Sequence, residues 1–191
     1  MNKNNGMFLI RIIGVFLLIT TGAFTCQGQT FTPCSITVNE IKINLLHKKI
    51  DALKNPWAPC VQPTHTLIHD EENESLSWNA LIFSRNHQKA FVAESNWQNK
   101  EQISRITIMD KQIPTTSGVH VGVRFEKIQA MVATTIPTES DGFLTLTDKN
   151  DPDIFYVMNI RGYPKLFFGV DHLSEIPGAV KVESIVVMNS H

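Results

Sequence analysis

His120 has the most unusual surroundings of the histidines, because it lies between two glycines in the segment GVHVGV. Gly118 and Gly122 have no side chains, so the imidazole would be open to a ligand or to a neighbouring backbone group. An imidazole becomes a general acid or base when a partner lies within hydrogen-bond reach, and Glu126 or Asp141 could provide a carboxylate partner. One hypothesis is therefore a small hydrolase or lyase with its site around His120.

The two glycines do not form a nucleotide-binding loop. Their spacing is G-x-x-x-G, whereas a dinucleotide fingerprint has a third glycine and a P-loop has Gly-Lys-Ser or Gly-Lys-Thr. The chain also lacks the G-x-S-x-G motif of a nucleophilic serine. We expect no cofactor, and a strand, a turn and a helix would explain the same stretch without any catalytic role.

His65 and His69 are the candidate metal ligands, because they lie four residues apart in the segment HTLIHDEE. On a β-strand they would share one face, with Asp70 or Glu71 nearby, so zinc or copper could bind there. The spacing matches neither H-E-x-x-H nor another recognised ligand pattern. The alternative is a pair of surface histidines, and no metal site is assigned.

The segment DKNDPD, residues 148–153, is similar to the start of a calcium-binding loop. It departs from that pattern because Pro152 occupies the third ligand position, no glycine follows, and the closing glutamate is missing. We expect a turn.

Three tryptophans, Trp57, Trp78 and Trp97, could form a platform on which a sugar stacks, because indole faces bury a large area at little entropic cost. Packing in the core or at a sheet edge is the alternative. The 11 phenylalanines against 2 tyrosines favour core filling.

The first residues, MNKNNGMFLIRIIGVFLLITTGAFTCQGQT, have the three-part layout of a secretory signal peptide. Lys3 and Arg11 lead into an apolar run that is shorter than the roughly 20 residues of a membrane span. Cleavage after Gly28 would remove residues 1–28 and give a secreted or periplasmic protein. In the alternative, the protein is a lipoprotein anchored through Cys26.

Cys34 and Cys60 are the pair that remains after cleavage, and export would place them where disulfides persist. We predict a bond between them that stabilises the fold by about 3 to 4 kcal/mol. A metal site at these cysteines would lack further ligands at suitable spacing.

The charge of the mature chain argues against nucleic acid as a partner. Without Lys3 and Arg11 it has 15 basic and 18 acidic side chains, a net charge of −3, and no basic stripe. The partner could be a protein, a glycan or a lipid. A membrane is expected as a partner only if Cys26 is lipidated.

Residues 29–191 have the length of one domain, with a possible division into two small lobes near residues 110–116. Thr37 and Glu40 form a capping-box pattern, and Asn55 before Pro56 would end the helix that follows. Its apolar face is formed by Ile41, Leu45, Leu46, Ile50 and Leu53. A strand through Ile41, Ile43 and Leu45 competes with this helix.

Short alternating runs predict strands over most of the remaining chain. They lie near residues 64–69, 77–84, 90–94, 103–109, 118–123, 142–147, 154–159, 165–170 and 180–188. NDPD and IRGYP are expected to form hairpin turns. A short helix should follow the strand from Gly118 to Val123, because Phe125, Ile128 and Val132 recur at helical spacing. The fold class is α+β, mainly antiparallel sheet.

The runs RITIMD, GVHVGVRFEKI, GFLTLT, IFYVMN and KVESIVVM, within residues 103–188, resemble a layout of uncharacterised bacterial envelope and secreted domains. The resemblance implies a strand-rich envelope domain of unknown activity and transfers no catalytic residue. The leading hypothesis is an exported, non-enzymatic binding or interaction module. The alternatives are the enzyme around His120 and a lipid-anchored accessory protein of the envelope.

Overall fold

The computed structural model describes residues 34–73, 75–133, 138–140, 142–168 and 170–189. These residues belong to one compact unit, Pro33–His191. The expected signal peptide and Cys26 lie outside the described residues. Among the described residues, no helix has the length and apolar character needed to cross a membrane.

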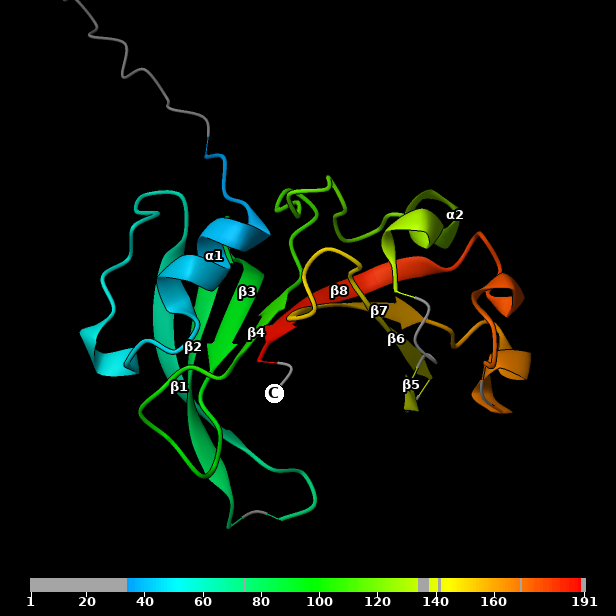
Figure 1. Ribbon diagram of the computed structural model, residues 1–191. Coiled ribbons are helices and arrows are strands. Elements are labelled where there is room, and N and C mark those ends of the chain that lie inside the picture. The colour runs from blue at the N-terminus through cyan, green and yellow to red at the C-terminus, as the bar shows by residue number, and fades with distance from the viewer. Residues whose placement is uncertain (1–33, 74, 134–137, 141, 169, 190–191) are drawn as a thin grey trace, which may run out of the picture. The chain divides into compact units, whose positions relative to one another are not determined.

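The described chain forms an α+β fold with one antiparallel sheet of eight strands (Figure 1). Their order across the sheet is β1, β2, β3, β4, β8, β7, β6, β5. In chain order they are β1 (Gln62–His69), β2 (Ser77–Arg85), β3 (Gln88–Glu94), β4 (Arg105–Ile108), β5 (Thr138–Ser140), β6 (Phe143–Thr147), β7 (Ile154–Asn159) and β8 (Lys181–Met188). The last strand in the sequence, β8, therefore pairs with β4 on one side and β7 on the other.

Alternation along the strands gives the sheet one fully buried face. Paired residues on successive strands continue this face from β2 to β6. They are Leu81 and Phe83, Phe91 and Ala93, Ile106 and Ile108, Ile185 and Val187, Ile154 and Tyr156, and Leu144 and Leu146. Figure 1 shows both α-helices on the same side of the sheet. The buried faces of these helices join the same apolar core.

Helix α1 (Val38–Leu45) begins as the sequence predicts, with the Thr37 side chain and the Glu40 side chain capping each other's backbone N–H groups. It ends earlier than predicted. His47 has a φ of 64°, which a helix does not allow, and Lys49 pairs with Gln102 as a β-bridge. The expected continuation is reduced to one 3₁₀ turn, η1 (Ile50–Ala52).

The predicted strand from Gly118 to Val123 is wrong. Gly118 and Gly122 have φ of +82° and +88°, and these left-handed conformations turn the chain twice. The valines alternate as in a strand, but of the three only Val119 is fully buried. The short helix that was predicted after this segment is present as α2 (Phe125–Ile128), and a 3₁₀ turn, η2 (Gln129–Met131), extends it.

Two other parts of the prediction also differ from the structure. Residues 165–170 were expected to form a strand, but the chain forms a 3₁₀ helix, η3 (Pro164–Phe168), and a second one, η4 (Leu173–Glu175), follows. IRGYP turns the chain, and the backbone N–H of Tyr163 donates to the carbonyl oxygen of Ile160. It is not a hairpin turn, however, because both 3₁₀ helices lie between this turn and the next strand, β8. NDPD does connect the hairpin of β6 and β7.

The segment before β1 is fastened to the core by a disulfide and an indole. Cys34 and Cys60 are bonded, as predicted. Trp57 is 8% exposed and meets Phe83 and Phe91 edge-on, with ring centroids 6.0 and 5.6 Å away. Trp57 is therefore a core residue and not part of a sugar platform.

Candidate functional site

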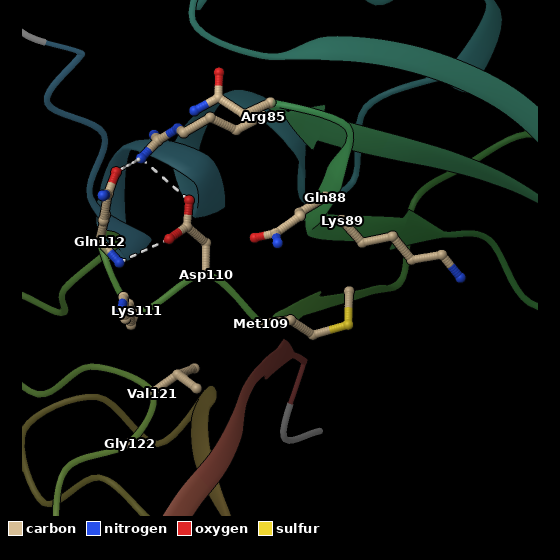
Figure 2. A pocket seen from close by; sticks show the side chains of 10 residues that line it. Arg85, Gln88, Lys89, Met109, Asp110, Lys111, Gln112, Val121 and Gly122 are labelled. Atoms are coloured by element: carbon tan, nitrogen blue, oxygen red, sulfur yellow. Dashed lines mark hydrogen bonds and ion pairs between the residues drawn. The ribbon is translucent and has the colours of Figure 1, made fainter.

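A cleft of about 420 Å³ lies beside the β2–β3 hairpin turn (Figure 2). It is lined by residues of three segments that are distant in the sequence. Arg85, Asn86, Gln88 and Lys89 come from the hairpin, Met109, Asp110, Lys111 and Gln112 from the loop after β4, and Val121 and Gly122 from the glycine-rich turns. The cleft therefore lies next to the segment that the sequence singled out.

The hairpin turn fixes one wall of the cleft. Asn86 and His87 have φ of 50° and 64°, and two successive positive φ values are the signature of a tight I′ hairpin. This turn places Arg85 opposite Gln88 at the end of the two strands. The Arg85 side chain is only 12% exposed, so its position is set by packing and not by solvent.

Arg85 is held by two residues of the loop after β4. Its Nη1 lies 3.1 Å from an Asp110 carboxylate oxygen and donates to Gln112 Oε1 at 2.7 Å. The other Asp110 oxygen accepts the Gln112 backbone N–H at 2.8 Å. Figure 2 shows the guanidinium directed at this pair. Both oxygens of the Asp110 carboxylate are therefore already engaged inside the protein.

Two further cations line the same cleft. Lys89 and Lys111 are exposed, and within the described ranges neither has an ion pair with a carboxylate. Figure 2 shows Lys89 extending away from the Arg85–Asp110 pair. Arg85 Nε and Nη2 are buried, and the described residues offer them no hydrogen-bond partner. The lining thus has three cationic side chains against one committed carboxylate.

Among the described residues, His120 has no carboxylate partner of the kind that the enzyme hypothesis requires. Its Nδ1 lies 2.9 Å from the carbonyl oxygen of Val121, and no described carboxylate makes an ion pair or hydrogen bond with its ring. Glu126 lies 3.8 Å from Arg124 instead, and Asp141 lies outside the described residues. His120 is half-buried and is not among the residues lining the cleft.

His65 and His69 are both exposed on β1, the edge strand. They share a face as predicted, but four residues along a strand correspond to about 13 Å. No group of three or more His, Cys, Asp or Glu side chains that could hold a metal exists in the part of the chain that the structure describes.

The segment that is similar to a calcium loop binds the side-chain ammonium group of Lys42. Lys42 of α1 reaches into the β6–β7 turn, and its Nζ lies 2.7 Å from Asp151 and 3.0 Å from Asp153. Burial lowers the pKa of Lys42, but the hydrogen bonds and charges of both aspartates outweigh it, so the net direction is up. The turn that the sequence predicts is therefore locked to α1.

Asp148, the first aspartate of this segment, takes part in a buried hydrogen-bond network. Asp148 is 4% exposed and accepts the backbone N–H groups of Asn150 and Asp151 and the hydroxyl of Tyr156. Burial, followed by the hydrogen bond to Asp148, raises the pKa of Tyr156. A cavity of about 410 Å³ adjoins Asp148, but both of its carboxylate oxygens are occupied.

Sequence reasoning missed the cleft residues, because the ion pair of Arg85 and Asp110 joins positions far apart in the chain. The one usable local signal was Asn86-His87 between two alternating runs, which indicates a tight turn with an adjacent side chain held in place.

No protein-family profile matches this chain, and no curated protein sequence matches it either. Among solved structures, it is similar to the crystal structure of the uncharacterized protein yfeY from Escherichia coli. The two share 20% sequence identity over 67% of this chain and 82% of the other, with a TM-score of 0.49. A similarity of this extent assigns no function to the chain.

Proposed function

We propose that this protein is an exported, non-enzymatic binding module, and that the cleft beside the β2–β3 turn receives an acidic group of its ligand. The observation that carries the proposal is the charge of the lining. Lys89 and Lys111 are unpaired among the described residues, while the carboxylate of Asp110 is committed to Arg85 and Gln112. An entering carboxylate or phosphate would meet cations without meeting a free negative charge.

The unsatisfied nitrogens of Arg85 support the same proposal. Buried polar groups are almost always hydrogen-bonded, and an exception calls for an acceptor, a water molecule or an ion. Nε and Nη2 of Arg85 are such exceptions within the described chain. An anion that shifts the guanidinium slightly would provide the missing acceptors, and guanidinium groups match the geometry of carboxylates and phosphates.

Export is supported by the signal-peptide layout of residues 1–28 and by the disulfide, which is compatible with an oxidising compartment. A lipid anchor on Cys26 remains the alternative for the location. The enzyme hypothesis is the weaker one, because the His120 ring contacts the carbonyl oxygen of Val121 and no carboxylate of the described residues.

The test uses citrate and inorganic pyrophosphate as carboxylate and phosphate probes, titrated calorimetrically at low salt. The double variant Lys89→Ala/Lys111→Ala should bind at least one probe roughly tenfold more weakly, since two surface charge contacts contribute about 0.5 to 1 kcal/mol each. The matched control is Lys48→Ala/Lys54→Ala, which makes the same change in net charge at exposed positions outside the cleft. Equal weakening in both variants, or no binding of either probe to the unaltered protein, would refute the proposal.

A further inference from the structure

Two tryptophans line a third, smaller hollow of about 170 Å³. Trp78 lies on β2 at a position that alternates with the buried Leu81 and Phe83, so it belongs to the sheet face opposite to the core. Trp97 lies in the β3–β4 connection and is 53% exposed. The sequence placed these indoles 19 positions apart, and the fold brings both to one hollow.

The sheet register supplies charged groups beside the indoles. Glu94 at the end of β3 pairs with Ala80 of β2 on one side and with Arg105 of β4 on the other. Trp78 Nε1 donates to a Glu94 carboxylate oxygen at 3.2 Å. This bond fixes the plane of the indole, so its exposed surface is presented in one orientation.

The turn that holds Trp97 is also fixed. The backbone N–H of Asn99 donates to the Asn96 side-chain oxygen at 2.6 Å. Ser95, which is buried, donates from both its backbone N–H and its hydroxyl to the carbonyl of Asn79. Trp97 is therefore pre-organised for binding, because the turn is already ordered and a ligand would not have to pay the entropy of ordering it.

Free polar groups surround the two rings. Among the described residues, the Arg105 guanidinium, the Ser104 hydroxyl and the side-chain nitrogen Nδ2 of Asn96 have no hydrogen-bond partner, and Trp78 uses only one oxygen of Glu94. One carboxylate and one guanidinium give the hollow no net charge. This differs from the cationic cleft at the β2–β3 turn.

We infer that this hollow is a subsite for one residue of an uncharged saccharide. A sugar ring has an apolar face that packs on an indole and hydroxyl groups around its edge that exchange hydrogen bonds with carboxylate, guanidinium and amide groups. The volume lies below the roughly 300 Å³ at which pockets for drug-sized ligands begin, so a single ring would occupy it. The open side would allow the rest of a glycan chain to continue across the sheet. A lipid chain would leave the polar groups unpaired.

The experiment measures retention of the full mature protein on insoluble cellulose, chitin and starch, which are uncharged polymers, followed by calorimetry with the tetrasaccharide of whichever polymer retains it. We expect retention by at least one polymer. Trp97→Ala should weaken the affinity at least tenfold, and Arg105→Ala should weaken it severalfold without altering thermal unfolding. The matched control is Ile43→Ala, which removes another exposed apolar side chain, 64% exposed on α1, and should leave binding unchanged.

Failure of all three polymers to retain the protein would overturn the inference. The inference would also be overturned if Trp97→Ala and Arg105→Ala both bound the saccharide with the affinity of the unaltered protein. The variant Lys89→Ala/Lys111→Ala should retain normal saccharide binding, so the result is independent of the test of the cationic cleft.

Discussion

Removing the bond between Cys34 and Cys60 should destabilise the domain by about 3.5 kcal/mol. The two cysteines are 26 residues apart, and a cross-link over a loop of that length lowers the entropy of the unfolded chain by about 12 cal/mol/K. The double variant Cys34→Ser/Cys60→Ser isolates this effect. Cys34 is exposed and Cys60 only half-buried, so the serines themselves should add little.

Urea unfolding monitored by tryptophan fluorescence provides the measurement. Trp57 lies in the core three residues before Cys60, so its emission reports on the segment that the disulfide fastens. With a slope of about 2 kcal/mol/M, the midpoint should fall by about 1.7 M. The unaltered protein in reducing agent should behave like the double variant. A loss below about 1 kcal/mol with an unchanged slope would refute the reasoning, because it would mean that the bond does not restrict the unfolded chain.

Two further predictions concern the buried polar contacts of the β6–β7 hairpin. Because the pKa of Tyr156 is raised in the folded protein, stability should be intact below about pH 10, the unfolded value, and fall as the pH rises further. Tyr156→Phe should lower the free energy of unfolding by about 1 to 3 kcal/mol at pH 7. In urea unfolding measured from pH 8 to 11.5, its stability should also fall less steeply with pH than that of the unaltered protein. An identical pH dependence in both proteins would contradict a raised pKa of Tyr156. Lys42→Met should cost about 1 to 3 kcal/mol, between the values for exposed and buried pairs, because Asp151 and Asp153 are left facing each other. Lys48→Met is the control, and a loss equal to that of Lys42→Met would contradict this prediction.

Much of the sheet could be predicted because its strands alternate on a two-residue period, and β7 was predicted with its observed boundaries, Ile154–Asn159. Alternation failed between Gly118 and Val123, where the valines suggest a strand while the glycines adopt backbone angles that only they adopt readily. Helical spacing overestimated α1, since the apolar residues after Leu45 pack into the same core from a turn and the separate 3₁₀ helix η1. The short strand β5, Thr138–Ser140, was missed because TES has no apolar pattern.

The candidate sites were less predictable than the fold. Sequence patterns drew attention to His120, but the cleft beside it is formed by Arg85 and Asp110, which meet only because β3 pairs with β4. The tryptophans were recognised as possible sugar ligands from their type alone. Trp78 lines a hollow with Trp97 because it lies on the outer face of β2, whereas Trp57 packs against Phe83 on the core face of the same strand. Strand register decides which residues lie on each face.

The central position of β8 determines when the fold can be completed. Strands β1 to β4 can pair with one another early, and so can β5 to β7, but in the sheet order the two groups meet only through Lys181–Met188. Until that segment arrives, β4 and β7 each present an unpaired edge, which is a template for pairing with other chains. Completion also depends on contacts between distant parts of the chain, which form slowly. A growing polypeptide therefore has its period of greatest exposure to aggregation immediately before its last strand inserts.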